Sequence, residues 1–211
     1  MANKKNKVKF NICNVHYAPI TVAEDGTVTF AEPVAMPGAV SISLDPTGEP
    51  ESFYADGIEY YVINNNQGYD GDLELAIIPE SFRTDILKET ADANNVRVEN
   101  ANSETGSFAL LFEFDGDIRK IRHVLYNCSA SRPTIESKTN EEDKEVETET
   151  LTIKARPMAN GYVKAKTGDS TTDTVYNDWY KSVYEPTTEV TVSKSSTTSS
   201  TSSTTNNIAS K

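Results

Sequence analysis

The sequence of 211 residues has little cysteine, histidine or tryptophan: two, two and one residue respectively. Cys13 and Cys128 are too few for a disulfide framework. No apolar run approaches the roughly 20 residues that a membrane helix needs, so no membrane span is expected. The lysine-containing stretch from Met1 to Phe10 has no apolar segment behind it. No export signal is therefore predicted, and the chain is expected to be made in a reducing cytoplasm.

Positive charge is also scarce. Lys and Arg number 20 against 32 Asp and Glu, which gives a formal net charge of -12. Proteins that wrap nucleic acid need an excess of Lys and Arg to contact phosphates, so this class is disfavoured. The only basic cluster comprises Lys4, Lys5, Lys7 and Lys9, and it is interpreted as a solvated, frayed terminus.

Apolar residues make up 36% of the sequence, below the roughly 45–50% usual in globular domains. Part of the chain is therefore expected to lie outside any core. Residues 1–186 are predicted to form one domain that contains a mobile acidic loop at about 136–149. Residues 187–211 are rich in Ser and Thr and are predicted to be a disordered tail.

Alternation of apolar and polar residues with period two dominates the domain and predicts a mainly β fold. The predicted strands are residues 8–17, 27–30, 34–44, 58–63, 68–78, 108–114, 118–130, 148–156 and 161–166.

Two helices are predicted between these strands. Pro79 suits a first helical position, and Phe82 shares a face with the residue four positions later, which predicts a helix over 79–89. An aromatic stripe that includes Trp179 predicts a second helix over 175–184. Packing is the expected role of this stripe.

A hairpin is predicted around Asp115-Gly116-Asp117. The predicted register places Phe108, Leu110 and Phe112 opposite Leu125, His123 and Ile121, and pairs Glu113 with Lys120.

Residues 45–68 are predicted to leave the body of the domain as a long arm. Turn-forming residues flank the short strand 58–63 on both sides. The arm nevertheless carries more apolar and aromatic residues than a solvent-exposed loop should. They are Phe53, Tyr54, Ile58, Tyr60, Tyr61 and Ile63. A surface of some kind is expected to cover them.

Chemical motifs are few. Cys13-x-x-His16 and His123-x4-Cys128 offer zinc-binding residue types. Residues an odd number of positions apart on an unbroken strand point to opposite faces, so no metal site is predicted. Asp70-Gly71-Asp72 and Asp115-Gly116-Asp117 lack the remainder of a calcium loop and are interpreted as turns. No nucleophile or nucleotide motif occurs, so neither an enzyme nor a cofactor is expected.

Several segments, in order along the chain, resemble the major tail proteins, the tail-tube subunits of long-tailed bacteriophages of Gram-positive hosts. They are Val15-His16-Tyr17-Ala18, Met36-Pro37-Gly38-Ala39-Val40, Phe53-Tyr54-Ala55-Asp56, the segment from Phe108 to Asp117, the segment from Arg122 to Cys128, and Trp179-Tyr180. The Ser/Thr tail departs from the family.

The resemblance implies a β-sandwich or partly open barrel with flanking helices, assembled as stacked hexameric rings in the virion. DNA would pass through the lumen as non-specific cargo. The implied partners are further copies of the chain and the tape measure, tail terminator and distal tail proteins. In such a tube the six apolar arm residues are expected to contact a neighbouring subunit.

The alternative is a carbohydrate-binding β-sandwich of a phage baseplate or cell surface. Trp179 distinguishes the two hypotheses, because a sugar platform needs it exposed whereas a packing role needs it buried.

Overall fold

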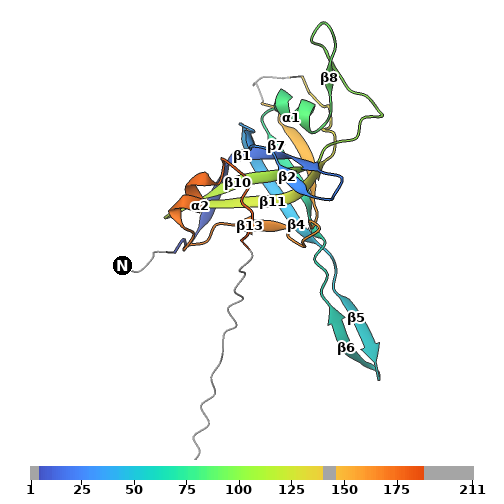
Figure 1. The fold of residues 1–211 in the computed structure, drawn as a ribbon, viewed down its shortest axis with the longest axis vertical. Helices are drawn as coiled ribbons and strands as arrows, with labels where there is room; N and C mark the ends of the chain where they lie inside the picture. The colour runs from blue at the N-terminus through green and yellow to red at the C-terminus, as the bar shows by residue number, and fades with distance from the viewer. Residues whose placement is uncertain (1–4, 140–145, 188–211) are drawn as a thin grey trace, which may run out of the picture.

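The computed structural model describes residues 5–139 and 146–187. The predicted tail, apart from Thr187, and residues 140–145 of the predicted acidic loop lie outside the described residues. The described chain is mainly β, as predicted, with a central curled sheet and two projecting hairpins (Figure 1).

The elements are, in chain order, β1 (Lys9–Val22), β2 (Val28–Phe30), β3 (Val34–Ala35), β4 (Ala39–Thr47), β5 (Glu51–Ala55), β6 (Ile58–Ile63), β7 (Gly68–Leu75), α1 (Glu80–Asp85), β8 (Thr90–Ala91), β9 (Arg97–Val98), β10 (Phe108–Gly116), β11 (Ile121–Ala130), β12 (Glu149–Ala155), β13 (Lys164–Lys166) and α2 (Asp173–Asp178).

Nine strands of the described chain form one antiparallel sheet. Its order is β2-β1-β10-β11-β12-β7-β4, with β3 also paired to β1 and β13 to β11. The sheet curls until β1 and β4 come into contact, but within the described residues no ladder joins these two strands. The sheet therefore forms a partly open barrel with a seam between β1 and β4.

The sheet buries both of its faces near β10, which explains the continuous apolar sequence of that strand. Phe108 and Leu110 face the barrel interior, where the ring of Phe82 from α1 packs edge-on against Phe108 at 5.2 Å. Leu111 faces the opposite side, in a second cluster that contains Trp179 and Val183. The α1 helix thus packs against the interior core, and the α2 region covers the outer face.

Both helices are shorter than predicted. Pro79 is the N-cap of α1 rather than its first residue, and Lys88 adopts a left-handed backbone with a φ of 61°, which the helix cannot continue through. Trp179 is the C-cap of α2, which begins two residues before the predicted start. The two predicted helix lengths were wrong: α1 ends before Leu87 and α2 ends before Trp179, and both of these residues are buried outside the helices.

The predicted register of the β10–β11 hairpin is wrong by two residues. Leu110 lies opposite Leu125, and Glu113 lies opposite Arg122. A wider loop separates the strands, and the side chain of Asn6 holds it by accepting hydrogen bonds of 3.0 Å from two of its backbone amides. Because the register differs from the predicted one by an even number of residues, each side chain keeps its predicted face of the sheet.

The same contacts correct the interpretation of the basic terminus. Asn6 is tied to the β10–β11 loop, and the amide of Lys7 donates a hydrogen bond of 2.8 Å to Asp117. Lys9 lies within β1, paired with Gly116. Lys5, Lys7 and Lys9 are exposed as predicted, but the chain from Asn6 onward is not frayed.

Asp70-Gly71-Asp72 is not a turn. It lies inside β7, between β4 and β12. A Cβ on Gly71 would lie 1.9 Å from the carbonyl oxygen of Ser43, so glycine is required for the close approach of β4.

Candidate functional site

The arm is a β-hairpin that extends the β4–β7 pair beyond the sheet. Strands β5 and β6 pair with each other and are joined by Asp56 and Gly57, whose φ values are 54° and 78°. Two successive residues with positive φ make a type I′ turn, the two-residue connection that suits the twist of paired strands. The predicted hairpin-like arm is confirmed, and β5 adds a strand that the sequence did not predict.

The arm projects away from the sheet in Figure 1. Its base is held where Gln67 donates a backbone hydrogen bond of 2.9 Å to the carbonyl of Thr47. Gly68 permits close backbone contact there, because a Cβ would lie 1.9 Å from the carbonyl oxygen of Ala155. The base is thus part of the sheet, whereas β5 and β6 beyond it pair only with each other among the described strands.

The six predicted arm residues are all exposed, by 50% to 68%. They are Phe53, Tyr54, Ile58, Tyr60, Tyr61 and Ile63. A monomer rarely exposes so many large apolar side chains on one element, and such patches mark interaction surfaces. Val62, 39% exposed, also belongs to this set but was not predicted.

The register divides the arm into two faces. Phe53 pairs with Tyr61, Ala55 with Ile58, and Glu51 with Ile63. Alternation along β5 places these pairs on one face, and the bulge between the pairs of Phe53 and Tyr54 brings Ile58 to the same face as Tyr61. Tyr54 and Val62 lie on the other, together with a hydrogen bond of 2.7 Å from the Ser52 hydroxyl to Glu59. The first face is the more apolar. We call it the apolar face of the arm.

The arm carries charge of one sign only. Its charged residues are Asp45, Glu49, Glu51, Asp56 and Glu59, and residues 45–68 contain no Lys or Arg. An acidic hairpin with an apolar face favours a surface that combines apolar groups with cations.

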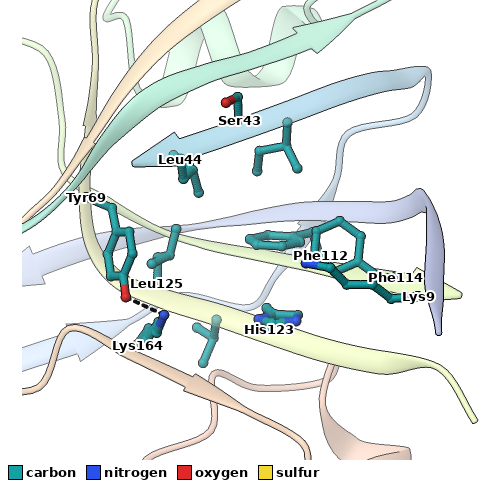
Figure 2. A pocket seen from close by; sticks show the side chains of 11 residues that line it. Lys9, Ser43, Leu44, Tyr69, Phe112, Phe114, His123, Leu125 and Lys164 are labelled. Atoms are coloured by element: carbon teal, nitrogen blue, oxygen red, sulfur yellow. Dashed lines mark hydrogen bonds between the residues drawn. The ribbon is translucent and has the colours of Figure 1, made fainter. Parts of the chain in front are cut away.

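A groove of about 340 Å³ opens beside the base of the arm (Figure 2). We call it the basal groove. Its apolar lining comes from β4, β10 and β11, and Tyr69 closes it at the first position after the arm. The apolar lining residues include Ile42, Leu44, Phe112, Phe114 and Leu125.

Two lysines flank this apolar lining. Nζ of Lys9 lies 4.8 Å from the centre of the Phe114 ring, and Nζ of Lys164 lies 4.2 Å from that of Tyr69. Lys164 also donates a hydrogen bond to the Tyr69 hydroxyl (Figure 2). Within the described residues, neither ammonium group forms an ion pair. The groove is therefore apolar with a cationic rim.

His123 lines the groove and stacks on Phe112, with ring centres 5.1 Å apart. Burial, together with repulsion from Lys166, Lys9 and Lys164, lowers the pKa of His123 to about 4. The imidazole is consequently neutral at physiological pH.

The sequence did not predict the basal groove. Its walls come from strands distant in sequence, and they meet only because the sheet curls. The one sequence feature that could have indicated the groove is Lys9, a cation on a predicted strand that also carries apolar residues.

The Cys and His residues do not form a metal site. Asn11 and Asn14 have positive φ values of 51° and 54°, so the assumption of an unbroken strand between Cys13 and His16 was wrong. Even so, among the described residues no group of three metal-ligating side chains converges. Burial raises the pKa of the Cys128 thiol to about 12, as for an inert core cysteine.

Trp179 is 2% exposed, and its ring stacks on Tyr184 at a distance of 5.5 Å. The predicted packing role is confirmed. This position counts against a sugar platform at Trp179. In the described part of the chain, no helix is long and apolar enough to cross a membrane.

Neither a protein-family model nor a curated protein matches the sequence. The solved structures that are similar to this chain include two tube-terminating proteins. The sheath/tube terminator of an extracellular contractile injection system is 8% identical, with a TM-score of 0.44 over 77% of this chain and 99% of that one. The tube-terminating cap of the anti-feeding prophage is 10% identical, with a TM-score of 0.41 over 80% and 98%.

Both neighbours are tube-terminating proteins.

Proposed function

We propose that this chain is a structural subunit that assembles with copies of itself into stacked hexameric rings, the tail tube of a long-tailed phage, through which DNA is ejected. The exposed arm carries this proposal. Its six large apolar side chains are solvent-exposed in the monomer, and assembly would remove them from water at a gain of roughly 25 cal/mol per Å².

The open seam of the barrel supports the same proposal. Strand β4 pairs only with β7 among the described strands, so its outer edge is available. An edge strand is an aggregation hazard in a monomer, whereas closure into a ring gives it a defined partner.

The resemblance of the sequence motifs to major tail proteins supports a proposed location and proposed partners for the chain. The protein would be made in the cytoplasm of the host bacterium and reside in the virion. There the tube would contact the tape measure, tail terminator and distal tail proteins. Acidic walls would repel the phosphates of the DNA and let it slide.

Electron microscopy of the concentrated protein tests the assembly. We expect rings or tubes, and mass spectrometry of parent virions should find the chain as an abundant component. Absence from virions, together with a protein that stays monomeric at every concentration, would exclude the proposal.

Hydrogen exchange tests the role of the arm. Amides of residues 49–66 should exchange fast in the monomer, because β5 and β6 pair only with each other among the described strands, and slowly in tubes. A variant with a short Gly/Ser linker in place of these residues should remain a folded monomer that forms no tubes. Tubes of normal length from this variant would show that the arm is not the contact.

A further inference from the structure

We propose that the basal groove is the receptor for the arm, so that the arm of one copy seats its apolar face in the basal groove of a second copy. This inference rests on the proposed function, and it adds where the arm binds.

The groove matches the arm in size and chemistry. Its volume of about 340 Å³ is at the small end of the usual range for binding pockets, which suits one or two aromatic side chains rather than a whole element. Phe112, Phe114 and Leu44 offer an apolar wall, and Phe53 and Tyr61 are paired neighbours on the arm. Aromatic side chains in such pockets are common anchors of interfaces.

Charge complementarity identifies the occupant. Lys9 and Lys164 form a cationic rim on a chain with a net charge of -12. Residues 45–68 carry five carboxylates and no Lys or Arg, and Glu51 lies on the apolar face of the arm, paired with Ile63. Such complementarity favours encounter in the correct orientation and suppresses other pairings.

The arm of the same copy does not fill this groove. Its apolar residues are exposed, and it points away from the sheet (Figure 1). The ladder from Thr47 and Gly68 into β4 and β7 fixes this direction, because folding back would break the hydrogen bonds at the base. An arm that occupies this groove therefore comes from a second copy of the chain.

The proposed contact is heterologous, because the arm and the groove are different surfaces of one chain. Each copy then gives an arm and receives one. Repetition of such a contact closes a ring if the rotation between neighbouring copies returns to the first copy. Otherwise the copies continue as an open helix.

Charge reversal on each side tests the inference. The groove variant carries Lys9→Glu and Lys164→Glu, and the arm variant carries Glu49→Lys and Glu51→Lys. Each variant alone should raise the protein concentration needed for assembly by at least about tenfold. Lys181→Glu, on the surface three residues after α2, is the control and should assemble normally.

Mixing the two variants is the decisive step. The groove variant keeps an acidic arm, and the arm variant keeps a cationic groove, while the two altered surfaces now have opposite charges. Equal amounts should co-assemble in alternation near the wild-type concentration. A misfolded variant could not give this rescue.

Photo-crosslinking gives an independent readout. A benzophenone amino acid at Phe53 should crosslink to residues 42–44 or 112–114 of a second copy. Crosslinks to other regions, or normal assembly of the groove variant, would overturn the inference. If the linker variant still failed to assemble in that case, the proposed function would stand and only the receptor site would be wrong.

A crosslinker at Leu44 tests the remaining occupants. Capture of residues 1–4 or 188–211 instead of the arm would assign the groove to a terminal segment and overturn the inference.

Discussion

Glu113 lies opposite Arg122 in the β10–β11 ladder and is only 3% exposed. One of its carboxylate oxygens accepts a hydrogen bond of 3.0 Å from Nε of Arg122, and the other lies 3.0 Å from Nζ of Lys120. Arg122 also donates a hydrogen bond to the carbonyl of Tyr176 in α2. This buried carboxylate therefore joins the sheet to the α2 region.

Replacing Glu113 by Ala should lower the free energy of unfolding by about 3 kcal/mol, because two cations lose their buried partner. Trp179 is the single tryptophan and lies in the α2 region, so its fluorescence during urea unfolding measures the change. Asp178→Ala breaks an exposed ion pair with Lys181 and should cost less than about 1 kcal/mol. An equal cost for both variants would contradict this role of Glu113.

Gly71→Ala should destabilise the protein by about 2 kcal/mol or more, since the new Cβ would overlap the backbone of Ser43. The base of the arm should loosen as β4 and β7 separate. Gly168→Ala is the control, because no atom lies within 4 Å of its added Cβ, and it should change the free energy of unfolding by less than about 0.5 kcal/mol. Thermal unfolding of both variants checks the difference.

His123 should make stability depend on pH. Its pKa is lowered to about 4 in the folded chain, whereas an unfolded chain has the ordinary value of about 6.5. Between these values the unfolded chain binds more protons, so the stability is complete above pH 6.5 and falls as the pH falls toward 4. The loss between pH 7 and pH 5 should be about 2 kcal/mol. His123→Phe retains stacking on Phe112 and should remove this loss in urea titrations; an unchanged loss would assign it to other groups.

The assembled tube should not retain DNA at physiological salt, because carboxylates outnumber cations in the chain by 32 to 20. Co-sedimentation of tubes with duplex DNA measures retention. Tight, salt-sensitive binding that crosslinks map to the lumen would contradict an acidic lumen.

Local patterns predicted much of the fold. Alternation placed most strands, and turn formers around residues 58–63 placed the arm, because both signals act over a few residues. The β10–β11 register was not predictable, since it depends on Asn6, which is more than 100 residues away in sequence. Asp70-Gly71-Asp72 has the composition of a turn, but long-range pairing with β4 and β12 places it inside a strand.

The site residues likewise comprise some that local sequence predicts and others that depend on long-range structure. Phe53 and Tyr61 were predicted as interaction residues because aromatic side chains on a polar excursion conflict with a solvent-exposed loop. The position of Ile58 on the same face was not predicted, because it requires the bulge between the pairs of Phe53 and Tyr54. Lys9 and Lys164 lie 155 positions apart, and only the curled sheet places both on one groove.

The two faces of the arm should differ in their importance for assembly. Phe53→Ser together with Tyr61→Ser removes the paired aromatics of the apolar face, whereas Tyr54→Ser removes one aromatic of the other face. All three residues are exposed, so each variant should keep the monomer's free energy of unfolding within about 0.5 kcal/mol per substitution. The apolar-face variant should form no tubes, because it lacks the anchors, and Tyr54→Ser should still form them. Sedimentation velocity at matched concentrations measures both; equal loss from the two variants would show that the arm is buried on both faces rather than seated by one.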